Sequence, residues 1–155
     1  GQSLNDEDLI AWIRLQLQEH QLSGEALHLT LSATEITRQF DNLQRFAAHT
    51  RALDCRLGIA DMHNDTRIFQ ALKRLPVSFI KIQTPIIQAL RRDREAVRQL
   101  RAICHRAHDQ GLTVIAPCVE DAESLNILWS NGVDYIEGFF IHPPELSLNY
   151  DFGEI

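Results

Sequence analysis

The spacing of apolar positions changes along the chain between that of helices and that of strands. Apolar residues at three- and four-residue steps predict a helix over about residues 6–19 that buries Ile10 and Ile13. Residues 27–32 then alternate apolar and polar side chains, as a half-buried strand does. The pattern returns to helical spacing from Phe40 to Leu53, which indicates one helix after this strand.

The same succession of strand and helix continues to residue 136. A helix follows the N-cap residue Asp65, a longer one covers about residues 94–109, and a third follows Asp121 and buries Leu125, Leu128 and Trp129. Pro76 ends the first of them, and Gly111 and Gly132 end the other two. Strands are predicted over residues 56–61, 79–83, 113–118 and 134–136.

Five strands that alternate with helices predict parallel βαβ units and an α/β fold. Two architectures are compatible with this order, a doubly wound sheet and part of a TIM-type barrel, which has eight strands and about 250 residues. The 155 residues fit one domain, and only the tail over residues 143–155 looks irregular.

Composition narrows the classes of function. The net charge of −6 argues against a non-specific nucleic-acid binder. The chain has neither a membrane-length apolar run nor a secretion signal, so we expect a cytoplasmic protein. Its three cysteines, which form no C-x-x-C pair, are expected to be buried thiols.

Chemistry in a β/α barrel is located at the carboxyl ends of the strands. Those positions are Thr30, Asp61, Gln83, Pro117 and Glu137, so the set contains two carboxylates. A two-metal phosphodiesterase needs more carboxylate ligands than that, because each of its divalent cations requires several oxygen ligands. Two acids would hold at most a single Mg²⁺, and weakly.

Several segments resemble motifs of the EAL domain family of cyclic di-GMP phosphodiesterases. Residues 77–82 resemble "VDxLKID", residues 111–116 followed by Val119-Glu120 resemble "GLxVIAEGVE", and residues 131–140 resemble "LGCDYVQGYxF". Residues 27–33 resemble "LELEITE" and residues 56–62 resemble "RIALDDF" more weakly. The resemblance covers roughly residues 9–144 and implies a partial TIM-type barrel with about five of the eight strands.

The departures from these motifs concern the metal-binding acids of the family. The family has acids at five positions where this chain has Thr30, Ala33, Ala60, Gln83 and Pro117. Glu137 stands where the family has a glutamine, and residues 63–67 replace the loop "GTGYSS". Only Asp61, Lys81 and Glu120 are kept. The strands that carry the "ExL" glutamate and the metal-binding asparagine have no counterpart in the chain, so three strands of the barrel must come from other polypeptide.

The resemblance therefore implies a non-catalytic module that binds cyclic di-GMP, with no catalytic residue, metal site or cofactor of its own. The residues expected to contact the nucleotide are Asp61, Lys81, Glu120, Glu137, Gly138, Phe139, Phe140 and Pro144. The ending from Ile141 to Phe152 is similar to that of a degenerate family member that regulates type IV pili, which implies a PilZ-type protein partner. A docking scaffold that binds no nucleotide is the alternative, and an active phosphodiesterase is the third hypothesis.

Simpler explanations exist for several of these residues. Asp61, His63 and Asp65 have the residue types of a metal site, but an acidic turn that caps the next helix explains them better. Lys81 would contact a phosphate or pair with Asp61. The arginines of residues 91–101 lie at helical steps, which favours a solvated outer face over a site for an acidic partner. Unpaired strand edges would lead either to a homodimer or to binding of the absent barrel half.

Overall fold

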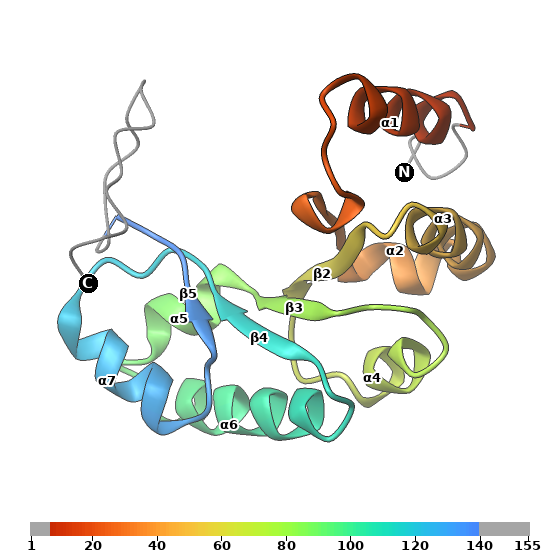
Figure 1. Ribbon diagram of the computed structural model, residues 1–155. Coiled ribbons are helices and arrows are strands. Elements are labelled where there is room, and N and C mark those ends of the chain that lie inside the picture. The colour runs from red at the N-terminus through yellow and green to blue at the C-terminus, as the bar shows by residue number, and fades with distance from the viewer. Residues whose placement is uncertain (1–6, 140–155) are drawn as a thin grey trace.

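Strands and helices alternate along the part of the chain that the computed structural model describes, residues 7–139 (Figure 1). The helices are α1 (Glu7–Glu19), α2 (Ala33–Arg38), α3 (Phe40–Ala52), α4 (Thr66–Leu72), α5 (Thr84–Ala89), α6 (Arg94–His108) and α7 (Ala122–Ser130), with a short 3₁₀ helix, η2, at Gly24–Ala26. The strands are β1 (His28–Ser32), β2 (Arg56–Met62), β3 (Phe79–Ile82), β4 (Thr113–Ala116) and β5 (Tyr135–Ile136).

The five strands form one sheet in which every neighbouring pair is parallel and the spatial order follows the chain order. This confirms the predicted α/β class and the number of strands. Figure 1 shows α4 and α6 along the same side of the sheet, while α1 lies at the end of the molecule opposite α7. The carboxyl ends of all five strands share one edge because the strands are parallel, and we call it the carboxyl edge.

The core lies between the central strands and the helices that cross over them. Ile59, Ile80 and Val114 are completely buried on β2, β3 and β4, and they pack in one cluster with Leu100 and Ile103 of α6. Burying side chains of this size stabilises the fold by about 1.5–3 kcal/mol each. The central strands β2, β3 and β4 are mostly apolar because parallel strands with helical crossovers are buried on both faces.

Gly58 in β2 is required by a close approach of the next strand. A Cβ atom at this position would lie 2.1–2.5 Å from ring atoms of Phe79 on β3. The ring of Phe79 also contacts the imidazole of His28 on β1, at 5.6 Å between centroids. Phe79 therefore spans three strands across the space that the glycine leaves open.

Aspartates begin three of the helices. The side chain of Asp65 accepts a hydrogen bond from the backbone N–H of Arg67 at the start of α4, and Asp121 accepts one from the N–H of Ser124 at the start of α7. Both caps confirm the sequence prediction. Asp93 caps α6 in the same way through the N–H of Glu95.

Three details differ from the sequence prediction. The helix predicted from Phe40 to Leu53 is α3, but α2 was not predicted; the two are separated at Gln39, whose backbone is not helical, at φ −152° and ψ 56°. Helix α5, which has Pro85 in its first turn, was not predicted. Trp129 was expected inside α7, but its side chain is 54% exposed, whereas Leu128 is fully buried.

The exposed arginines of residues 91–101, in the α5–α6 turn and on α6, contact α7 and the residue that follows it as well as solvent. Arg91 pairs with Glu123 at 2.8 Å, and the Nε of Arg101 donates to the Oδ1 of Asn131 at 3.1 Å. These contacts fasten α7 to α6 and to the turn before it, so some of these arginines have a role within the fold. None of the helices in the described part of the chain has the length and hydropathy of a membrane span.

Candidate ligand-binding site at the carboxyl edge

Asp61 lies in a bulge close to the end of β2. Ile59 pairs with Ile80 and Met62 with Ile82, so β2 has one more residue than β3 in the same interval. The extra residue allows Asp61 to adopt a left-handed backbone with φ 58°, which aspartate tolerates better than most side chains. The bulge turns the carboxylate of Asp61 outward, and this side chain is exposed at the carboxyl edge.

The carboxylate of Asp61 is held from the neighbouring strand. Ser32, the last residue of β1, donates its hydroxyl proton to Oδ2 of Asp61 at 2.9 Å. Sequence reasoning did not single out Ser32. The sequence signal was that Ser32 ends the strand predicted over residues 27–32; the structure adds that it pairs with Ala60 of β2 and caps α2.

Lys81 does not pair with Asp61, as the sequence had suggested, but with Glu137. Its ammonium group donates to both carboxylate oxygens of Glu137, at 2.7 and 2.9 Å. Lys81 is on β3 and Glu137 follows β5, so the pair bridges over β4 at the position of Pro117. Pro117, which follows β4, has no carboxylate to offer to Lys81.

Gly138 has a structural explanation beside its predicted ligand contact. Its φ is 147°, and a Cβ atom there would lie 2.3 Å from the carbonyl oxygen and 2.4 Å from the nitrogen of Val119. The N–H of Val119 donates to the carbonyl of Glu137 at 2.9 Å, which joins the segments that follow β4 and β5. The next residue, Phe139, is 64% exposed, so it is available for stacking and does not fill the core.

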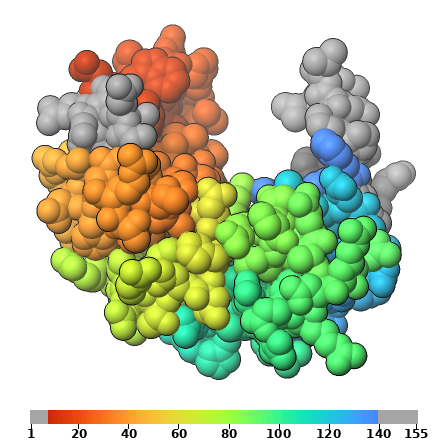
Figure 2. Space-filling view, turned by 180° about the vertical axis from the view of Figure 1, so that it is seen from behind, coloured from red at the N-terminus to blue at the C-terminus, as the bar shows by residue number. Residues whose placement is uncertain are grey.

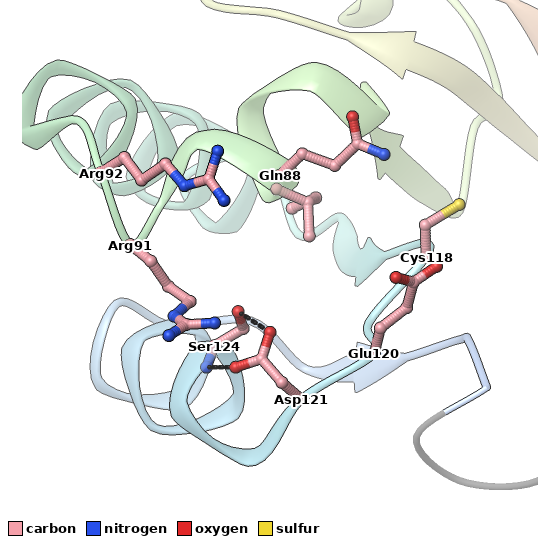
Figure 3. Close-up of a pocket in the computed structure, with 8 residues that line it drawn as sticks. Gln88, Arg91, Arg92, Cys118, Glu120, Asp121 and Ser124 are labelled. Carbon is pink, nitrogen blue, oxygen red and sulfur yellow. Dashed lines mark hydrogen bonds between the residues drawn. The ribbon is translucent and has the colours of Figure 1, made fainter.

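Glu120 lines a pocket to which none of the other predicted contacts among the described residues contributes. The pocket, of about 360 Å³, lies between α5 and α7 and is also lined by Gln88, Arg92 and Cys118. Figure 3 shows the two arginines of the α5–α6 turn on one side of this pocket and Glu120 beside Cys118 on the other. Asp121 and Ser124 on its wall bond to each other, with 2.8 Å between their side-chain oxygens.

Cys118 is exposed, with its sulfur 3.7 Å from the hydroxyl oxygen of Thr84, which corrects the expectation that all three cysteines are buried. The backbone of Cys118 is left-handed, at φ 56°, and turns the side chain away from the core. Cys55 and Cys104 are buried as expected. Burial raises the pKa of the Cys104 thiol to about 12.

The side chains described at the carboxyl edge do not fit a pair of divalent cations. Asp61 and Glu137 are both bound by protein donors, and they come from strands that are not adjacent. Within residues 7–139, no three histidines, cysteines or acids lie together as metal ligands would. Phe140 and Pro144, the last two predicted contacts, lie outside the described residues.

The loop after β2 contains a strongly bound acid. Asp65 accepts hydrogen bonds from the guanidinium and the N–H of Arg67, each at 2.8 Å. These bonds lower the pKa of the Asp65 carboxyl from 3.8 to about 2. Helix capping and the ion pair with Arg67 therefore account for the acid at position 65.

The lowered pKa predicts an acid-dependent contribution to stability. A carboxyl whose pKa is lower in the folded state stabilises the fold above its unfolded pKa, and this contribution disappears as the pH falls from about 4 to about 2. Asp65→Asn keeps a capping oxygen but does not titrate, so we expect its melting temperature to fall less steeply over this interval. Thermal unfolding at a series of pH values measures the slope. Asp93→Asn, which changes another aspartate that caps a helix, is the control. Equal slopes in the Asp65 variant and the wild type would contradict the assignment of the acid dependence to Asp65.

Figure 2 shows the molecule from behind, where its surface is hollowed between the N-terminal part, coloured red to orange, and the green part of the chain.

The model of the EAL domain family matches residues 1–144. The signaling protein YkoW of Bacillus subtilis is 24% identical over 144 residues, which are 93% of this chain and 18% of YkoW. The cyclic di-GMP phosphodiesterase PdeL of Escherichia coli is 27% identical over 134 residues, 81% of this chain and 35% of PdeL.

Two solved structures have a similar fold and sequence. The EAL domain of Xanthomonas citri FimX, in complex with cyclic di-GMP, superposes with a TM-score of 0.92 at 32% identity, over 98% of this chain and 60% of that one. The EAL domain of Pseudomonas aeruginosa FimX, bound to cyclic di-GMP, gives 0.88 at 31% identity, over 97% and 62%. The chain thus spans about three fifths of these domains, in agreement with the partial barrel inferred from five strands. It belongs to the EAL domain family.

Proposed function

We propose that this chain is a non-catalytic EAL module that binds cyclic di-GMP at the carboxyl edge and passes the signal to a protein partner. The observation that carries the proposal is the set of acids at this edge. Asp61 and Glu137 are the carboxylates there, and each is bonded to a protein side chain, Ser32 or Lys81. Such an edge can bind a ligand through hydrogen bonds and charge, whereas hydrolysis with two cations requires additional acids.

The groups at this edge suit the parts of a guanine dinucleotide. An ammonium group such as that of Lys81 attracts a phosphate, and carboxylates accept hydrogen bonds from the N–H groups of guanine. Phe139 offers an exposed ring, and stacking of a base on an aromatic ring contributes about 1–3 kcal/mol. The cyclic di-GMP complexes of the two FimX domains, which share 31–32% identity with this chain, support the choice of ligand.

Calorimetric titration of cyclic di-GMP tests the proposal. The titrations use this chain and a longer protein with the remaining strands of the barrel, each with Mg²⁺ and with EDTA, and chromatography detects any product. We expect saturable binding in the longer protein, an affinity that EDTA does not change, and no product. Hydrolysis that requires Mg²⁺ and is lost in Asp61→Asn would instead establish a phosphodiesterase.

A specific observation favours docking of further polypeptide as a second function. The large apolar side chains that the structure exposes lie at the two ends of the sheet. They are Trp12, Leu15 and Leu22 at the N-terminal end, and Trp129, Tyr135 and Phe139 at the C-terminal end. Exposed apolar surface of this kind is typical of an interaction site.

This surface suits the three absent barrel strands, a second copy of the chain or a PilZ-type protein. Light scattering distinguishes a homodimer from a monomer, and mixing with the partner protein tests a heterocomplex. If neither protein gives heat with cyclic di-GMP but a complex forms, the docking scaffold is the correct function.

A further inference from the structure

Ser32 has a bonding pattern that fixes the direction of its only hydroxyl proton. The side-chain oxygen of Ser32 accepts a hydrogen bond from the hydroxyl of Thr34 at 3.1 Å and a longer one from the N–H of Thr34 at 3.4 Å. A serine hydroxyl has two acceptor sites and one proton. With both acceptor sites used by Thr34, the proton is directed to Oδ2 of Asp61, at 2.9 Å.

The carboxylate that receives this proton has little else to fix its direction. Asp61 lies in a bulge with a left-handed backbone, and its side chain is exposed. Oδ2 is occupied by Ser32, while Oδ1 has no hydrogen bond to any residue in the described range 7–139. Without the serine, the Asp61 side chain would be free to rotate about its χ angles in solvent.

We infer that Ser32 is a positioning residue, which holds Asp61 so that Oδ1 faces a hydrogen-bond donor of the ligand. The inference rests on the proposed function, and it assigns the chemistry of the contact. An ionised carboxylate accepts hydrogen bonds and repels phosphate, so the group on Asp61 is an N–H of guanine or a ribose hydroxyl. The phosphodiester then lies on the side of Lys81, on β3, the strand next to that of Asp61.

The test compares Ser32→Ala, which removes the hydroxyl, with Ser32→Thr, which keeps it. Because a hydrogen bond to a charged group contributes about 1.5–3 kcal/mol, we expect Ser32→Ala to weaken cyclic di-GMP binding roughly tenfold or more. Ser32→Thr should bind within about twofold of the wild type. Calorimetry on the protein with the complete barrel measures the dissociation constants.

A matched control separates positioning from helix capping, because Ser32 also caps α2. Ser23 caps the helix η2 by the same kind of bond, to the N–H of Glu25, and contacts no carboxylate in the described structure. Ser23→Ala should therefore lower the melting temperature and leave the affinity unchanged. Wild-type affinity in Ser32→Ala, or failure of threonine to restore it, would overturn the inference. Absence of binding in the wild type would overturn the proposed function itself.

Discussion

We expect Gly138→Ala to lower the free energy of unfolding by about 2–6 kcal/mol and to abolish binding of cyclic di-GMP. The φ of 147° is a conformation that essentially only glycine adopts. The added methyl group would also stand 2.3 Å from the carbonyl oxygen of Val119, which is backbone and has little room to move. Relief of this clash must separate the segments after β4 and β5, which takes Glu137 away from Lys81.

Chemical unfolding measures the stability, and calorimetry measures the binding. Gly111→Ala is the control, because Gly111 also has a positive φ, of 70°, but no atom lies within 4 Å of the position of its Cβ. It should cost only about 1–2 kcal/mol and keep full affinity. Equal losses of stability in the two variants would show that the approach to Val119 is unimportant.

The second large effect is expected from Lys81→Met, which removes the charge but keeps the length of the side chain. The pair with Glu137 is partly solvated, with 26% and 49% of the two side chains exposed, so its loss should change stability by less than about 1 kcal/mol. The affinity for cyclic di-GMP should fall tenfold or more, because the ligand loses a cation and Glu137 loses its anchor. Calorimetry and thermal unfolding of the same preparation separate the two quantities.

Lys73→Met controls for the loss of a positive charge. Lys73 is the other of the two lysines in the chain, and it is exposed at the end of α4. The protein with Lys73→Met should bind the nucleotide as the wild type does. An unchanged affinity in Lys81→Met would show that the ammonium group does not contact the ligand. Asp61 and Phe139 would then remain as candidate contacts of cyclic di-GMP.

The order of strands and helices could be predicted from the sequence because local signals and the fold agree. Apolar spacing marked all five strands, and the aspartates at positions 65 and 121 capped the helices as predicted. Helix α2 was missed because it begins directly after β1 and has only six residues. Helix α5 was missed because its six residues are too few for a helical period to show.

The candidate site was predicted less completely, because it depends on contacts between distant segments. Spacing placed Lys81 and Asp61 on neighbouring strands, but the partner of Lys81 lies 56 residues away, beyond an intervening strand. The bulge at Asp61 and the turn at Cys118 reorient side chains in ways that a regular strand pattern does not reveal. Glu120 was assigned to the site from a motif, yet it lines the pocket beside α7.

The agreement between chain order and spatial order in the sheet has a consequence for how the protein is made. Each strand pairs with the strand synthesised just before it, from β1 to β5. A nascent chain can therefore add one βα unit at a time to a sheet that already exists, without waiting for distant residues. When β5 arrives it covers the open edge of β4, and the two edges of the described sheet that still lack a partner strand are β1 and β5.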